Sequence, residues 1–174
     1  MLRKLYTLAK TYKPFDKTTA KGVYLSVVPN EKALASLVEL SASLGLPLSK
    51  AEQEELHCTV VYSKAIPECI DSLSASLDPG AAYEVRIVGL EWWGGHDNAG
   101  YVVLRLQSPA LAELNREWLA AGCTSSHAGY NPHITLKKDV GPRPEDFYER
   151  RKAVYPFIGT NFCMTNPTVE STKH

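Results

Sequence analysis

The chain has 174 residues, 44% of them hydrophobic, which suits one globular domain with a sizeable core. Nineteen basic and nineteen acidic side chains give a formal net charge of zero, so a protein that coats long nucleic acid by charge alone is excluded. No apolar run approaches the ~18 residues that a membrane-spanning helix needs.

Residues 1–20 lack clear periodicity, and we expect a loop or arm there. The run at 22–29 predicts an apolar strand closed by a proline. A helix follows, with Asn30 as its N-cap and Gly45 at its end. The run LHCTVVYS at 56–63 predicts the next strand, and 67–80 predicts a short helix that ends at Pro-Gly.

The second half begins with a predicted hairpin, made of strands at 82–93 and 101–107 around a glycine-rich turn. A helix is expected over 108–122, capped by Ser108 and opened by Pro109. The remaining expected elements are a strand at 129–138, a short helix at 143–154, a last strand at 155–165 and a loose tail over 166–174.

This order of elements predicts an α+β fold in a single domain that spans 1–174. A β-α-β opening recurs as β-β-α-β in the second half, which indicates two similar lobes. We expect mainly antiparallel sheets with helices on their outer sides, and we assign 22–165 to the bilobal core.

One short pattern occurs in both halves. His57-Cys58-Thr59-Val60 and His133-Ile134-Thr135-Leu136 each place a histidine two residues before a threonine inside a β-prone run. Residues i and i+2 of a strand point to the same face, so each histidine projects together with its threonine. If the two strands are neighbours, two imidazoles and two hydroxyls converge.

Such a set suits phosphodiester cleavage. One imidazole takes a proton from the attacking hydroxyl and the other gives a proton to the leaving oxygen, because histidine titrates near neutral pH. The threonines can donate to phosphate oxygens. No metal or other cofactor is expected, because the four cysteines form no CxxC pair and no further ligands lie near either motif.

A single His-x-Thr segment usually marks only a partly buried histidine beside a β-branched residue. The second copy, in an equivalent strand context, favours catalysis by His57, Thr59, His133 and Thr135.

The two motifs, and NPHITL in particular, resemble those of the 2H phosphoesterase superfamily, and the similarity covers most of 22–165. It implies a bilobal, pseudo-twofold (LigT-like) fold with both motifs lining a central groove. By motif, His57 and His133 would be the acid/base pair, and Thr59 and Thr135 would hold the phosphate.

The stretches KGVYLSVVPNEKA and LHCTVVYSK are most similar to bacteriophage anti-CBASS nucleases, which act on cyclic di- and trinucleotide immune messengers such as cyclic GMP-AMP. This resemblance implies attack by a ribose 2′-hydroxyl on its own 3′–5′ linkage and an immune-evasion role in the host bacterial cytoplasm. The family also leads us to expect an acidic residue after the last strand, and only Glu170 is available.

Five residues are candidates for substrate binding. Trp92 and Trp93 adjoin the hairpin tip, and since adjacent strand residues face opposite ways, one can stack on a base while the other packs. Tyr24 and Tyr12 are further stacking candidates, and Lys137 shares the strand face of His133.

Two histidines and one tyrosine are set aside. His96 and His127 lie in loops and are expected at the surface. Tyr62 is an odd number of residues from His57, so a regular strand would turn it toward the core.

Three functions fit the sequence. The first is a metal-independent phosphodiesterase for cyclic oligonucleotides, acting as a monomer or small homo-oligomer without long nucleic acid or membrane as partners. The second is an RNA 2′,3′-cyclic phosphodiesterase or RNA-end processing enzyme, which the absence of basic surface disfavours. The third is a non-catalytic sponge for cyclic nucleotides, which two intact motifs disfavour.

Overall fold

Six antiparallel strands form a closed ring in the computed structural model, in the order β1-β2-β5-β4-β3-β6. The structure describes residues 15–94, 99–125 and 127–172. The strands are β1 (Val23–Pro29), β2 (Cys58–Ser63), β3 (Tyr83–Gly94), β4 (Gly100–Gln107), β5 (His133–Lys137) and β6 (Asn161–Ser171). The mixed α+β class with an antiparallel sheet is thereby confirmed.

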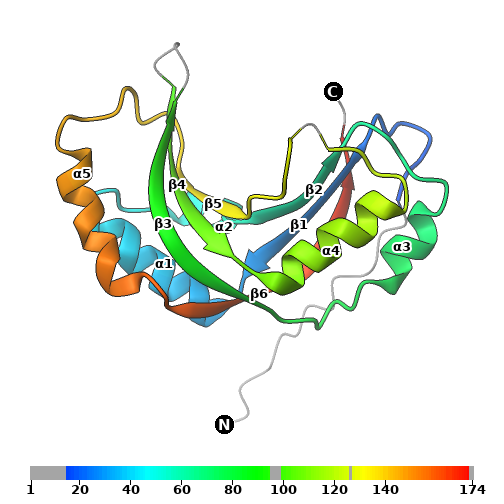
Figure 1. The fold of residues 1–174 in the computed structure, drawn as a ribbon, viewed down its shortest axis with the longest axis horizontal. Helices are drawn as coiled ribbons and strands as arrows, with labels where there is room; N and C mark the ends of the chain where they lie inside the picture. The colour runs from blue at the N-terminus through cyan, green and yellow to red at the C-terminus, as the bar shows by residue number, and fades with distance from the viewer. Residues whose placement is uncertain (1–14, 95–98, 126, 173–174) are drawn as a thin grey trace, which may run out of the picture.

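The helices lie outside the ring of strands (Figure 1). They are α1 (Glu31–Ser43), α2 (Lys50–Glu55), α3 (Ile70–Ser76), α4 (Pro109–Ala120), α5 (Phe147–Arg150) and the 3-10 helix η1 (Arg151–Phe157). Figure 1 shows α1 and α5 on the side of β3, and α3 and α4 on the side of β1 and β2. No helix among the described residues combines the length and apolar character needed to cross a bilayer.

Local sequence signals explain where the two long helices begin. Asn30 caps α1, and its side chain accepts a hydrogen bond from the Ala33 amide at 2.8 Å. Ser108 caps α4, and Pro109 occupies the first turn, as the sequence predicts. Each helix then buries an apolar stripe against the strands.

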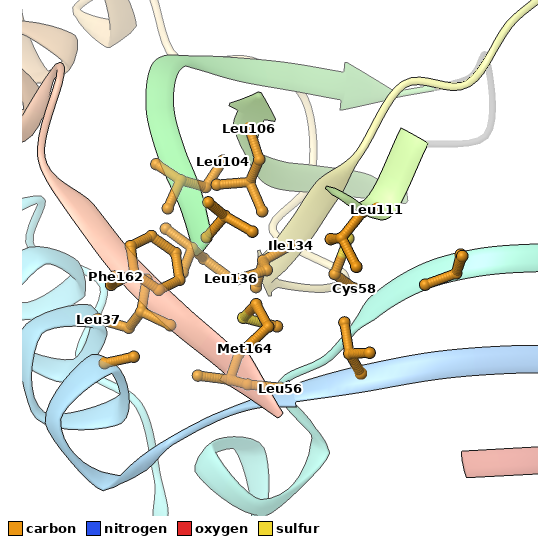
Figure 2. Close-up of a cluster of buried hydrophobic side chains, with 14 of the residues drawn as sticks. Leu37, Leu56, Cys58, Leu104, Leu106, Leu111, Ile134, Leu136, Phe162 and Met164 are labelled. Atoms are coloured by element: carbon orange, nitrogen blue, oxygen red, sulfur yellow. The ribbon is translucent and has the colours of Figure 1, made fainter. Parts of the chain in front are cut away.

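Two lobes meet along a narrow seam between β2 and β5. The register of these strands records one Cα pair, Cys58 with Ile134, whereas β1–β2 and β3–β4 pair along most of their length. Both residues are fully buried, and Figure 2 shows them within the hydrophobic cluster. The middle residue of each His-x-Thr motif therefore anchors that motif to the core.

The C-terminal part of the chain differs from the sequence expectation. Residues 151–157 form η1, and the strand predicted at 155–165 instead runs from Asn161 to Ser171. Pro156 has no amide hydrogen for a strand ladder, and Gly159, at a φ of 84°, makes the turn that ends the helix.

The expected loose tail is also wrong as far as Ser171, because β6 pairs with β1 over that stretch. An irregularity opposite Ser26–Val28 interrupts the alternation, and Asn166 there takes a φ of 49°. The broken alternation hides the strand from a periodicity argument.

Helix α2 is a short element that the sequence interpretation missed. Its signal is a capping box: the Ser49 side chain accepts from the Glu52 amide, and the Glu52 carboxylate accepts from the Ser49 amide at 2.8 Å. This helix precedes β2 directly and so sets the entry of His57 into the seam.

Gly100 sits where β4 begins, and a side chain there would overlap the carbonyl oxygen of Gly141 and lie 2.5 Å from Trp92 Nε1. We expect Gly100→Ala to lower the free energy of unfolding by about 1–3 kcal/mol through overpacking. The matched control is Gly89→Ala in β3, where an added Cβ meets nothing within 4 Å. Urea denaturation of both variants checks this, and equal midpoints would contradict it.

Candidate active site

The four motif residues share one face of the seam, which we call the motif face. His57 stands directly before β2 and His133 opens β5. Cys58 and Ile134 point into the core, whereas His57, Thr59, His133 and Thr135 are all partly exposed. Strand alternation therefore places the two imidazoles and two hydroxyls on the same side.

The Cys58–Ile134 pair also fixes the spacing of the histidines. In an antiparallel pair, the residues that precede two opposed residues lie on a diagonal. Such diagonal neighbours are roughly 7–8 Å apart at the backbone. His57 and His133 are therefore diagonal neighbours at the backbone across the seam.

The two imidazoles make equivalent hydrogen bonds. His57 Nδ1 lies 2.7 Å from the carbonyl oxygen of Glu55, and His133 Nδ1 lies 2.8 Å from that of Asn131. A carbonyl oxygen only accepts, so Nδ1 carries the hydrogen in both rings. This leaves Nε2 of each ring as the atom that gains or loses a proton.

Each histidine has an aromatic neighbour from its own lobe. The Tyr24 ring meets His57 edge-on at 6.0 Å between centroids, and Trp93 lies 4.6 Å from His133. The Tyr24 hydroxyl is 2.8 Å from Thr59 Oγ1. Burial raises the pKa of Tyr24, so its hydroxyl stays protonated around neutral pH.

A polar network lies behind Trp93 and His133. The indole Nε1 of Trp93 donates to Glu91 at 2.5 Å, and Arg105 donates to the other oxygen of the same carboxylate at 2.9 Å. Arg105 also reaches the Asn131 side chain at 3.3 Å, next to the carbonyl that orients His133. The hydrogen bond from Trp93, with a further contribution from Arg105, lowers the pKa of Glu91.

An aromatic pocket of about 350 Å³ opens beside the motif face. It contains Thr59 and His133 together with Tyr24 and Trp93, so it joins the catalytic candidates to two of the predicted stacking residues. Tyr130 also lines it, and its hydroxyl donates to the Thr59 carbonyl at 3.1 Å. Burial raises the pKa of Tyr130, which keeps it a donor.

The interpretation of Tyr62 as a core residue is wrong. Its side chain is 44% exposed and lines the aromatic pocket, 6.2 Å from the Tyr24 ring. The register passes from Leu25–Val61 to Ser26–Thr59, so one residue of β2 is left over. This bulge reverses the alternation beyond Val60.

Two substrate-binding candidates lie elsewhere. Trp92 takes the opposite side of β3 from Trp93 and packs edge-on against Phe147 at 5.5 Å, so it is withdrawn as a stacking residue. Lys137 follows a register shift in β5 and donates to Glu52 at 2.9 Å and to the Pro47 carbonyl at 3.0 Å. Its ammonium holds β5 to α2, a contact that lowers the pKa of Glu52 to about 2.

The remaining candidates are placed as follows. Tyr12 and His96 lie outside the described residues. Exposed His127 lines the aromatic pocket. Glu170 lies in β6 opposite Tyr24, not in a loose tail. Within the ranges that the structure describes, no group of three or more His, Cys, Asp or Glu residues is arranged to hold a metal ion.

Comparisons with known proteins point to one family. The model of the anti-CBASS protein Acb1 family matches residues 21–156. The chain is 32% identical over 127 residues to Acb1 of Enterobacteria phage T4, covering 72% of this chain and 78% of that protein. It is 31% identical over 129 residues to Acb1 of Yersinia phage phiR1-RT, covering 73% and 77%.

A solved structure supports the fold. The protein TT0787 of Thermus thermophilus superposes with a TM-score of 0.51 at 16% identity, covering 85% of this chain and 83% of that one. At this identity the likeness concerns the fold alone.

The lowered pKa of Glu91 leads us to expect a pH-dependent contribution of this residue to the stability of the fold. A carboxyl whose pKa is depressed by folding stabilises the protein above its ordinary value of 4.5, and that contribution is lost as pH falls through the folded pKa. We expect the melting temperature of the wild type to exceed that of Glu91→Gln by a constant margin above about pH 4.5. The margin should shrink below it.

Thermal melts from pH 7 to pH 3 measure this margin. Glu54→Gln removes an exposed carboxylate of α2 and serves as the control. A margin that persists unchanged to pH 3 would contradict the assigned contact.

Proposed function

The chain belongs to the Acb1 family of anti-CBASS proteins, and on that basis we propose that it cleaves cyclic di- or trinucleotide immune messengers, such as cyclic GMP-AMP, inside the infected host cell. The observation that carries the proposal is the pair of imidazoles with matched Nδ1 contacts on one motif face. The reaction is a metal-independent phosphodiester cleavage and needs no cofactor.

The proposed reaction starts from a ribose 2′-hydroxyl next to a 3′–5′ linkage. One imidazole Nε2 takes the hydroxyl proton while the 2′-oxygen forms a bond to phosphorus. The bond from phosphorus to the 5′-oxygen breaks, and the other imidazolium gives its Nε2 proton to that oxygen. The products of this step are an opened ring and a 2′,3′-cyclic phosphate, which water converts to a 3′-phosphate in a second step.

The carbonyl contacts explain why both histidines can exchange protons without changing orientation. The Nδ1 hydrogen donates to the carbonyl of Glu55 or Asn131 in the neutral ring and in the imidazolium. Protons are therefore exchanged at Nε2 only, and the ring stays fixed. The same geometry at both sites lets either histidine act as the base, depending on how the substrate lies.

The threonines are proposed to hold the phosphate. Thr59 and Thr135 accompany the imidazoles on the motif face, where their hydroxyls can donate to non-bridging oxygens as negative charge builds. Tyr24 is within hydrogen-bond distance of Thr59 and can orient its hydroxyl.

The surroundings favour a small ring over a long RNA. The aromatic pocket holds about 350 Å³ and offers aromatic side chains, Trp93 among them, as platforms for bases. The chain has a net charge of zero, so a polymer backbone gains little from it. A small cyclic messenger can be bound by the few groups of the pocket, without an extended basic surface.

Both histidines should be indispensable. We expect His57→Ala and His133→Ala each to lower kcat for 3′,3′-cyclic GMP-AMP by about 10²–10⁴-fold, because each removes one proton-transfer group. The dissociation constant should change little, and a chelator should leave wild-type turnover intact.

Chromatography of the products of a cyclic dinucleotide and of a short RNA with a 2′,3′-cyclic end measures these rates. Turnover of the RNA alone would support RNA-end processing, and tight binding of the ring without cleavage would support a sponge. Loss of turnover with the chelator would contradict the metal-free reaction.

Substitutions of Trp92 and of Trp93 should affect substrate binding differently. Trp93→Ala removes a platform beside His133 and should raise KM for the cyclic dinucleotide roughly 5- to 150-fold, since stacking contributes about 1–3 kcal/mol per base. Trp92→Phe keeps an aromatic ring against Phe147 and should leave KM unchanged. Steady-state kinetics of both variants check this, and an equal rise in KM would contradict the assignment.

A further inference from the structure

The bulge in β2 changes what the strand presents to the pocket. Val60 and Val61 are adjacent, yet both are 2% exposed, and the register with β1 skips Val60. Without the extra residue, Tyr62 would face the core. With it, Tyr62 stands on the same side as Thr59, at the rim of the aromatic pocket.

Side chains from two other elements hold the backbone at the bulge. Asn115 of α4 is 8% exposed, and its Nδ2 donates to the Val60 carbonyl at 2.7 Å. Tyr130 donates to the neighbouring Thr59 carbonyl at 3.1 Å. Consecutive carbonyls on either side of the bulge are thus bound by side chains that also line the pocket.

The pocket extends well beyond the motif face. Besides Thr59 and His133, its lining includes Tyr62 of β2, Leu119 of α4 and Thr124. Of the two motif histidines only His133 lines it, while its walls come from both sides of the seam. A substrate whose phosphate lies between the histidines has one of its nucleosides directed into this space.

Two aromatic platforms border this space from opposite lobes. Trp93 comes from β3 and is tied down by Glu91, whereas Tyr62 comes from β2 and makes no side-chain hydrogen bond within the described ranges 15–94, 99–125 and 127–172. Tyr24 is already engaged with Thr59 and His57. A cyclic dinucleotide carries two bases, and these two rings give each base a platform.

We propose that Tyr62 is a specificity-determining residue that stacks on the second nucleobase of a cyclic dinucleotide, and that Asn115 is the positioning residue that keeps it there through the Val60 carbonyl. The inference rests on the proposed function and narrows its substrate class. The ligand is a ring with two bases, not a single nucleotide with a cyclic phosphate.

The test compares a two-base substrate with a one-base substrate. Wild type and Tyr62→Ala are assayed on 3′,3′-cyclic GMP-AMP and on 2′,3′-cyclic AMP. We expect KM for the dinucleotide to rise roughly 5- to 150-fold in Tyr62→Ala with kcat changed less than about threefold. KM for the mononucleotide should stay constant, and Tyr62→Phe should behave like the wild type.

The matched control is Tyr155→Ala on η1, which removes a tyrosine that is 54% exposed and lies away from the aromatic pocket. It should leave both KM values unchanged. An unchanged dinucleotide KM in Tyr62→Ala, or an equal rise for both substrates, would overturn the inference.

Asn115 is tested through its coupling to Tyr62. Asn115→Leu should raise the dinucleotide KM, and the double variant with Tyr62→Ala should be no worse than Tyr62→Ala alone. Asn115→Gln keeps the donor and should restore part of the affinity. A purely structural role would instead lower the melting temperature and add to the effect of Tyr62→Ala, which would overturn the assignment of Asn115.

Calorimetric binding of 3′,3′-cyclic GMP-AMP separates this inference from the proposed function. Cleavage by the wild type with identical behaviour of Tyr62→Ala defeats the inference alone. Binding without cleavage, weakened in Tyr62→Ala, defeats the proposed catalysis and supports the inference. Neither binding nor cleavage by the wild type overturns both.

Discussion

The candidate site depends on one buried contact between lobes, the pairing of Cys58 with Ile134. Both side chains are fully buried, so transfer from water holds the seam together, at about 1.5–3 kcal/mol for a side chain of the size of isoleucine. Burial raises the pKa of the Cys58 thiol to about 11, which makes it a neutral core group and not a nucleophile. The residues on either side of this pair are then directed to the opposite face by alternation alone.

This constraint explains how much of the site follows from the sequence. The period of two within each motif predicts that His57 joins Thr59 and that His133 joins Thr135, and the structure has both pairs on one face. The caps of α1 and α4 are equally local signals, and the structure matches them. The meeting of the two strands is not local, and only the repetition of the motif and the family resemblance indicate it.

The sequence predictions that proved wrong concern residues at which the inward–outward alternation of side chains along a strand is interrupted. A bulge in β2 turns Tyr62 to the pocket, a register shift after Thr135 precedes the turn of Lys137 toward α2, and another in β6 conceals a strand that carries Glu170. Bulges depend on which distant groups satisfy the freed backbone, such as the Asn115 amide at the Val60 carbonyl. No short window of sequence contains both the bulged backbone group and the distant side chain that binds it. Counting odd and even positions along a strand therefore fails to predict which way a side chain points there.

The two histidines are alike, but their surroundings are not. Each ring has the same carbonyl contact two residues earlier, yet His57 faces the edge of Tyr24 while His133 lies against Trp93, which Glu91 and Arg105 hold in place. Of the two histidines, only His133 lines the aromatic pocket. A symmetric pair of bases can run proton transfer in either direction, so the direction in which a substrate is cleaved must be set by recognition. The different aromatic neighbours of the two histidines can set that direction. Substrate selection then depends on the groups around the motifs and not on the motifs themselves.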